Sequence, residues 1–183
     1  MTGSQQPKHN LAGRMPIYTG NSYYLIFRIL HPILAILFTD YFIYKFNLPK
    51  EAIYVGIVLT GIVLIYSFLL LKKMVYVEFN ENSVTITYLI NKKVKDIPYS
   101  KLTKFTCIDG QIGFHFNIFE FRTDDFLNTD KVKLDRIVHN DNFISFIKWL
   151  KNKNEKIEFK IIPPDSKLLY EYYKEFGKTK TVK

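Results

Sequence analysis

Few residues of this chain combine the type and the spacing that chemistry requires. The four histidines, His9, His31, His115 and His139, lie in separate regions of the sequence. His115 and the single cysteine, Cys107, flank an Asp109-Gly110 turn, so strands paired around that turn could bring them face to face. Two ligands are too few for a structural zinc site, and no CxxC or HExxH sequence accompanies them. The sequence therefore predicts no metal site and no cofactor.

Other groupings with catalytic potential are equally incomplete. The segment Gly110-Gln111-Ile112-Gly113 lacks both the spacing and the Lys-Ser/Thr pair of a phosphate-binding loop. Asp124-Asp125 is a pair of neighbouring carboxylates, but such pairs in loops are usually solvated. No catalytic residue is assigned, and we expect that the protein is not an enzyme.

Lys92, Lys93 and Lys95 gather near one predicted strand turn. They are the candidates for binding an anionic lipid or a small anionic ligand, and the net charge of +9 favours an anionic partner. Anionic lipid is a simpler partner for these basic residues than nucleic acid, because an apolar region nearby would bring lipid headgroups within reach. The alternative, that these lysines only solvate the turn, stays open.

The elements that must position these residues begin with two long apolar segments, residues 23–46 and 52–71. The second contains no ionisable side chain except the phenols of Tyr54 and Tyr66. At the helical rise per residue it spans roughly 30 Å, the thickness of the hydrocarbon core of a bilayer. We therefore expect residues 23–73 to form a transmembrane helical hairpin in contact with the lipid bilayer.

Apart from tyrosines and Lys45 near its end, three ionisable side chains lie within the first segment. Arg28, His31 and Asp40 could line a polar path or bind an ion. Alternatively, Arg28 and Asp40 lie near the two interfaces and His31 hydrogen-bonds to a neighbouring helix. In the second segment Gly56 and Thr60 are four residues apart, a spacing that lets helices approach closely, within the hairpin or between protomers.

The basic residues that flank the two apolar segments predict on which side of the membrane the termini lie. Basic residues precede the first segment and follow the second, whereas the hairpin loop offers only Lys45 and Lys50. This distribution predicts a multi-pass protein of the cytoplasmic (inner) membrane with both termini in the cytoplasm, and the unpaired Cys107 fits that side. Residues 1–22 show no apolar periodicity, and we expect a flexible tail that orders only near Ile17-Tyr18.

Beyond the hairpin the apolar period changes from helix to strand. Short alternating runs over residues 74–162 predict a β domain, with an amphipathic helix at 142–153 capped by Asn140 or Asp141. A change of apolar phase in Ile112–Phe121 predicts a β-bulge or a sharp bend. The remaining residues, 163–183, hold a predicted helix at 166–176, capped by Asp165 or Ser166, and a basic tail.

The order of short strands, the step Ile97-Pro98-Tyr99-Ser100-Lys101-Leu102 and the following amphipathic helix resemble the bacterial pleckstrin-homology-like domains often found behind one or two transmembrane helices. The resemblance covers residues 76–153. It implies an α+β membrane protein whose small antiparallel β-barrel or bent sheet is plugged by the helix containing Phe143–Leu150. The strand at 157–161 and the helix at 166–176 extend beyond the usual end of such domains.

The resemblance implies no single activity, because such domains serve as interaction or ligand platforms. We expect a membrane-anchored interaction or assembly module, a subunit of a larger complex with a protein partner or a second copy of the chain. The alternative is a ligand-sensing membrane effector, in which the domain binds a small anionic ligand and the hairpins oligomerise or perturb the membrane.

Overall fold

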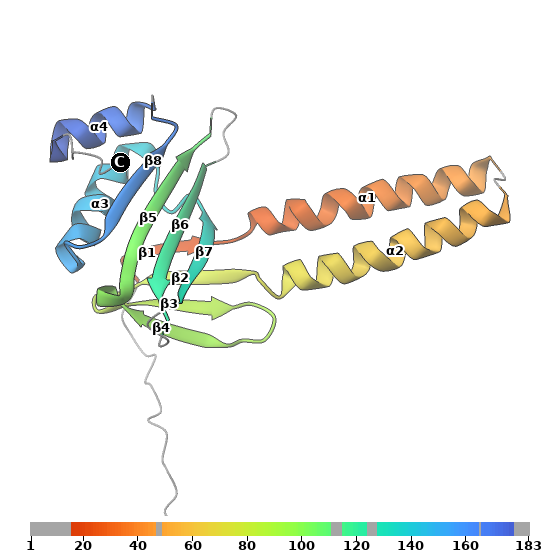
Figure 1. Cartoon of the computed structure of the whole chain (residues 1–183), viewed down its shortest axis with the longest axis horizontal. Helices are drawn as coiled ribbons and strands as arrows, with labels where there is room; N and C mark the ends of the chain where they lie inside the picture. The colour runs from red at the N-terminus through yellow and green to blue at the C-terminus, as the bar shows by residue number, and fades with distance from the viewer. Residues whose placement is uncertain (1–15, 47–48, 111–114, 124–127, 165, 178–183) are drawn as a thin grey trace, which may run out of the picture.

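Two long helices, α1 (Tyr24–Lys45) and α2 (Lys50–Leu71), lie side by side and project away from the rest of the chain (Figure 1). The computed structural model describes residues 16–46, 49–110, 115–123, 128–164 and 166–177. Both helices are long and apolar enough to cross a membrane, and they lie within two residues of the predicted segments. Only 6% of the apolar window in α1 and 17% of that in α2 is buried, so neither is a core helix of the globular part.

The first sheet contains four antiparallel strands in the order β1-β2-β3-β4. They are β1 (Tyr18–Asn21), β2 (Val75–Phe79), β3 (Ser83–Tyr88) and β4 (Val94–Pro98). β1 precedes the hairpin and β2 follows it, so the hairpin is inserted between two neighbouring strands (Figure 1). Residues 18–21 were predicted to lie in the flexible tail, but they belong to the sheet, because β2 offers them a free edge.

The second sheet has the order β7-β6-β5-β8, with β5 (Leu102–Asp109), β6 (His115–Arg122), β7 (Thr129–Asp135) and β8 (Glu158–Ile162). A short 3-10 turn, η1 (Tyr99–Lys101), connects the two sheets. β8 pairs with β5 in parallel, whereas the alternating runs of the sequence predict an antiparallel β structure. The physical reason is α3 (Asn140–Lys153), which lies between β7 and β8 in the chain and gives the connection enough length for a parallel pairing.

The two sheets do not close into a barrel within the described residues, which corrects the barrel form of the prediction. β1 and β7 meet through side-chain packing instead of a hydrogen-bonded ladder. At Gly20 an added Cβ would lie 2.9 Å from Cδ1 of Leu134 and 3.1 Å from Cγ1 of Ile137. Only glycine permits this close approach of the two sheets.

α3 carries the apolar face that its sequence predicts. Phe143, Phe146, Ile147 and Leu150 are all buried, and Phe146 contacts the rings of Phe79 and Phe105 from the two sheets. The helix starts two residues before the predicted position, and the cap prediction is wrong: His139 occupies the N-cap position without a side-chain hydrogen bond.

The change of apolar phase in β6 does not mark a bulge in its described part. Asn117, Phe119 and Phe121 face the core, while Phe116 and Ile118 are half-buried on the opposite face. The register shift between β5 and β6 lies in β5 instead, between Leu102 and Lys104. Ile112 to Phe114, where the predicted slip begins, lie outside the described residues.

The last helix, α4 (Lys167–Phe176), packs on α3 and β8. Its start agrees with the sequence, because the Ser166 side chain accepts a hydrogen bond from the Leu169 N–H at 3.2 Å. Its end also agrees, since Gly177 follows with a φ of 75°, the left-handed region in which glycine ends helices. α3 and α4 lie at the end of the molecule opposite to the hairpin (Figure 1).

Candidate functional site

The strongest grouping of polar contacts lies where the hairpin leaves the sheets. Ser22, between β1 and α1, is buried, and its hydroxyl accepts a hydrogen bond from the Val75 N–H at 2.7 Å. The Ser22 N–H donates to the Val75 carbonyl at 3.1 Å. These bonds join the two ends of the hairpin at its base. The hairpin therefore leaves the domain through two short connections that are tied to each other.

Asp135, the last residue of β7, holds the start of α1. Its Oδ2 accepts a hydrogen bond from the Tyr24 N–H at 3.0 Å, across 111 positions of the sequence. The first N–H groups of a helix lack partners within the helix and carry partial positive charge, which a carboxylate satisfies. Burial raises the pKa of Asp135, while its bonds from the backbone of Tyr24 and Tyr23 and the charge of Lys133 oppose that rise.

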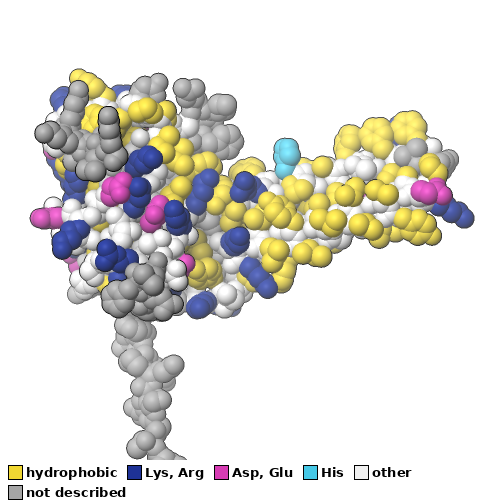
Figure 2. Space-filling model, in the orientation of Figure 1, with side chains coloured by type: hydrophobic (Ala, Val, Ile, Leu, Met, Phe, Trp, Pro, Cys, Tyr) yellow, Lys and Arg dark blue, Asp and Glu magenta, His cyan; other side chains and the backbone are white. Residues whose placement is uncertain are grey.

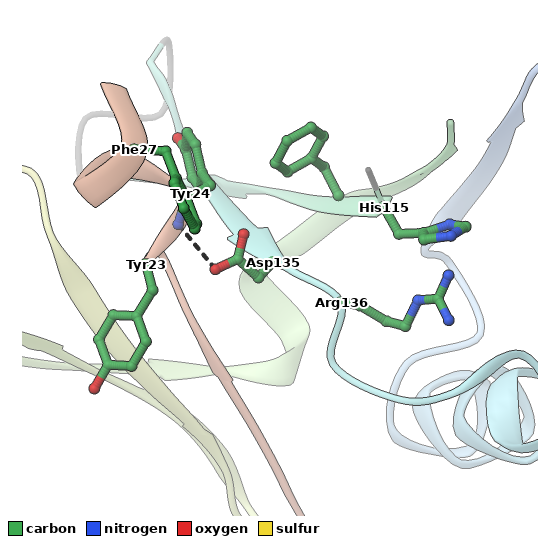
Figure 3. Close-up of a pocket in the computed structure, with 7 residues that line it drawn as sticks. Tyr23, Tyr24, Phe27, His115, Asp135 and Arg136 are labelled. Atoms are coloured by element: carbon green, nitrogen blue, oxygen red, sulfur yellow. Dashed lines mark hydrogen bonds between the residues drawn. The ribbon is translucent and has the colours of Figure 1, made fainter. Parts of the chain in front are cut away.

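A pocket of about 390 Å³ opens beside this contact (Figure 3). Its walls combine aromatic rings from the first turn of α1 and from β6 with polar groups from β6 and from the end of β7. The lining residues are Tyr23, Tyr24, Phe27, His115, Phe116, Asp135 and Arg136. Such a lining suits a ligand with an apolar part and an anionic group, because Arg136 can hold the charge and the rings can cover the apolar part.

His115 and Cys107 do not face each other across the strand pair. His115 pairs with Asp109, and its Nδ1 lies 2.6 Å from Asp109 Oδ1, whereas Cys107 pairs with Asn117. Burial is the main cause that raises the pKa of the Cys107 thiol to about 12. At neutral pH the thiol is protonated, which makes it a poor nucleophile and a poor metal ligand.

Basic side chains surround the base of the hairpin. Figure 2 shows Lys and Arg gathered where the globular part meets the hairpin, whose own surface is mainly hydrophobic up to its far end. We call Arg28, Lys72, Lys73, Lys92, Lys93, Lys133 and Arg136 the basic collar. Lys133 Nζ lies 3.7 Å from the centre of the Phe116 ring. Its pKa is lowered, first by burial and then by repulsion from Arg28.

The three lysines predicted as a binding site have different surroundings. Lys92 and Lys93 lie in the exposed turn between β3 and β4. Lys95 lies within β4, where its Nζ is 3.1 Å from Asp130 Oδ2 and 4.8 Å from the centre of the Phe121 ring. The charge of Lys95 is thus already matched by a carboxylate, while the other two lysines belong to the collar.

The hairpin residues predicted to form a polar path or a packing contact also have different surroundings. Arg28 lies near its base, and His31 is exposed on α1. Asp40 and Gly56 meet across the hairpin, because a Cβ built on Gly56 would lie 3.2 Å from Asp40 Oδ1. Thr60 donates from its hydroxyl to the Gly56 carbonyl at 2.9 Å. Gly56 therefore serves packing within the hairpin, one of the two arrangements that its sequence left open.

Sequence reasoning missed the central contacts of this site. Ser22 lay in the predicted tail, Asp135 ends an ordinary alternating strand and Arg136 follows it, so no local signal marked them. Among the pocket residues, Phe116 left a trace as part of the apolar phase change in β6, and His115 was singled out only as a possible neighbour of Cys107. Contacts between residues far apart in sequence, such as Asp135 with Tyr24, leave no spacing that can be read.

No group of three or more His, Cys, Asp or Glu side chains suited to a metal ion occurs among the described residues. The chain was compared with protein families, with curated proteins and with solved structures, and none of the three comparisons gave a match.

Proposed function

We propose that the protein is an integral membrane protein whose hairpin of α1 and α2 spans the bilayer. The observation that carries this proposal is the exposed apolar surface of the hairpin, which ends in the basic collar. Exposed rings and aliphatic side chains in water would be costly over so large a surface, whereas in lipid they cost nothing. The collar then lies at the level of anionic headgroups.

The β domain is proposed to be pleckstrin-homology-like. In support, one sheet of consecutive antiparallel strands is followed by a second, and α3 fills the space against both of them. On this view the hairpin is an insertion between the first two strands, while β8 and α4 are additions. The excess of basic residues at the base, against Lys50 and Lys45 at the tip, favours a cytoplasmic position for the domain in an inner membrane.

The task that we propose is interaction or assembly. The bonds of Ser22 and Asp135 fix the domain relative to the hairpin, so its far end with α3 and α4 points away from the membrane. Tyr170 on α4 is 72% exposed there, and aromatic side chains of this kind are common anchors at protein interfaces. A protein partner or a second copy of the chain would meet this end.

Limited proteolysis of the protein in liposomes tests the membrane position. We expect proteinase K to leave a protected fragment that contains α1 and α2, because lipid shields the backbone of a spanning helix. Cleavage within α1 or α2 would contradict the proposal. Purification in a mild detergent with mass identification tests the assembly, and a monomer without any partner would contradict it.

The pocket supports the second candidate function, ligand sensing. It is lined by the first turn of α1, so an anionic ligand held by Arg136 would contact the helix directly, beside the Asp135 bond. Ligand binding could then favour one position of the hairpin over another. In support, the same pocket touches both the domain and the hairpin, so a bound ligand would make different contacts when the hairpin moves relative to the domain.

Dye release from proteoliposomes tests this second candidate. A small anionic amphiphile that acts through the pocket should release dye from vesicles with the unaltered chain and not from those with Arg136→Gln. Lys95→Gln is the matched control, because it removes a cation whose partner is Asp130 and that does not line the pocket. No release across a broad set of anionic amphiphiles would contradict ligand sensing.

A further inference from the structure

The turn between β3 and β4, together with the first residue of β4, carries three apolar side chains that are partly exposed. Leu89 is 37% exposed, Ile90 50% and Val94 51%. Other exposed large hydrophobic side chains lie mostly on the hairpin itself. Residues 89–94, which we call the β3–β4 loop, thus combine apolar exposure with the two lysines Lys92 and Lys93.

The position of this loop is set by the hairpin. The Leu89 N–H donates to the carbonyl of Met74, the residue that links the end of α2 to β2, at 3.0 Å. The loop points in the same direction as the hairpin and lies beside the base of α2 (Figure 1). It therefore reaches the level at which α2 leaves the domain, where Lys72 and Lys73 also lie.

The charges of the loop are not matched within the described part of the chain. Neither Lys92 nor Lys93 forms an ion pair with another described residue, and both are exposed. Lys92 also has a φ of 51°, a conformation that turns the chain sharply at the tip. An apolar tip flanked by unmatched lysines is the composition that suits the boundary between headgroups and acyl chains.

We propose that the β3–β4 loop docks into the membrane interface beside the hairpin, with Leu89 and Ile90 reaching below the headgroups and Lys92 and Lys93 contacting anionic lipid phosphates. This inference rests on the proposed spanning hairpin and adds a third, reversible membrane contact. The partner is the lipid surface, because the loop lies beside the base of α2 and points in the same direction as the hairpin that is proposed to span the membrane (Figure 1). Because the Ser22 and Asp135 bonds fix the domain on the hairpin, docking of the loop limits the tilt of the domain and hairpin relative to the membrane plane.

Depth-dependent quenching of tryptophan fluorescence tests the inference in the full chain. Trp149, the only tryptophan, is replaced by Phe, and one tryptophan is then placed at Ile90, at Phe38 on α1 or at Tyr170 on α4. The vesicles contain phosphatidylcholine with phosphatidylglycerol, and bromine at a shallow or a deep position of the acyl chains. We expect Ile90→Trp to be quenched by the shallow bromines, Phe38→Trp by deep ones, and Tyr170→Trp by neither.

The outcomes separate the inference from the function on which it rests. If Phe38→Trp is quenched but Ile90→Trp is quenched no more than Tyr170→Trp, the loop does not dock and the hairpin still spans. If Phe38→Trp is not quenched, both ideas are wrong. These readings need no assumption about a partner protein.

The lysines are tested in the Ile90→Trp background. Lys92→Asn keeps a residue that tolerates positive φ, and Lys93→Gln completes the neutralisation. Each lysine near an anionic surface changes the docking equilibrium by roughly fivefold, so the pair should bring quenching in anionic vesicles close to that of Tyr170→Trp. Unchanged quenching would refute the role of the lysines. Lys95→Gln, which removes a paired lysine, is the control that should leave quenching unaltered.

Discussion

Asp135 is the residue through which the β domain holds the first turn of α1. Its carboxylate accepts the Tyr24 N–H at 3.0 Å while burial raises its pKa. The same side chain therefore does two opposed things at neutral pH: it satisfies the helix start and carries a partly desolvated charge. Substitutions of Asp135 can separate the effect of the hydrogen bond from the effect of the charge.

Asp135→Asn should weaken the pH dependence of stability. The pKa of Asp135 in the folded chain lies above the unfolded value of 3.8, so the folded chain binds this proton more tightly. The resulting stabilisation is full below about pH 3.8 and is lost as pH rises through the folded pKa. The melting temperature in detergent should therefore fall less between about pH 4 and about pH 7 in Asp135→Asn than in the unaltered chain.

A comparison of Asp135→Ala with Asp135→Asn separates the contribution of the hydrogen bond to Tyr24 from that of the charge. Asp135→Ala removes the acceptor altogether and leaves the Tyr24 N–H without its partner, which should cost about 1 kcal/mol relative to Asp135→Asn. Equal melting temperatures of the two variants at neutral pH would show that the hydrogen bond does not hold α1.

Cys107 provides a second prediction at this scale. Cys107 is 5% exposed, and the pKa of its thiol is raised to about 12, against an ordinary value of 9.0. The thiolate fraction at mildly alkaline pH should therefore be roughly a thousandfold lower than for an ordinary thiol. Maleimide labelling should be very slow in the native chain and fast in denaturant. Rapid labelling of the native chain would contradict the buried position of β5.

At the scale of elements, α1 and α2 approach each other closely at Gly56. Gly56 on α2 faces Asp40 and Ile43 on α1 at 3.2 Å from an added Cβ, while nothing lies within 4 Å of such a Cβ at Gly61. The two glycines are thus a natural matched pair. One lies in the helix contact, and the other borders open space.

Gly56→Ala should loosen the hairpin and Gly61→Ala should not. The added methyl group makes the side-chain ends of Asp40 and Ile43 give way by a few tenths of an ångström, which disturbs the contact of α1 with α2 at a cost of about 1–2 kcal/mol. The midpoint of an SDS titration, followed by the helical circular dichroism signal, should fall for Gly56→Ala and stay for Gly61→Ala. Equal midpoints would contradict the packing of α1 on α2.

Elements with their own period could be predicted from the sequence. The apolar runs located α1 and α2, and Phe143 to Leu150 located the buried face of α3. β1 was missed because Tyr18-Thr19-Gly20-Asn21 has no alternation, and it becomes a strand only because β2 offers an edge. The parallel pairing of β8 and the Asp135 contact depend on residues far apart in the chain, so no local pattern encodes them.

For the whole molecule, the insertion of the hairpin between adjacent strands has a direct consequence. Asn21 pairs with Tyr76, and the Ser22 N–H bonds to the Val75 carbonyl at 3.1 Å. A two-residue turn can therefore replace residues 23–74 without breaking the sheet. The large buried cluster of the two sheets, α3 and α4 contains none of the removed residues.

The chain in which Asn-Gly joins Ser22 to Val75 should be a soluble, folded domain. It keeps the core that holds Phe79, Phe105 and Phe146, and it loses the exposed apolar surface. We expect a single cooperative thermal transition and slow labelling of Cys107, as in the full chain. Aggregation or rapid labelling would show that the domain needs its hairpin to fold.

Extraction of membranes with alkaline carbonate tests the spanning hairpin most directly. The full chain and the chain without residues 23–74 are expressed side by side, and each is located after high-speed centrifugation. The full chain should stay in the membrane pellet after carbonate treatment, while the shortened chain should be in the supernatant. Release of the full chain into the supernatant as a folded, non-aggregated protein would contradict the account.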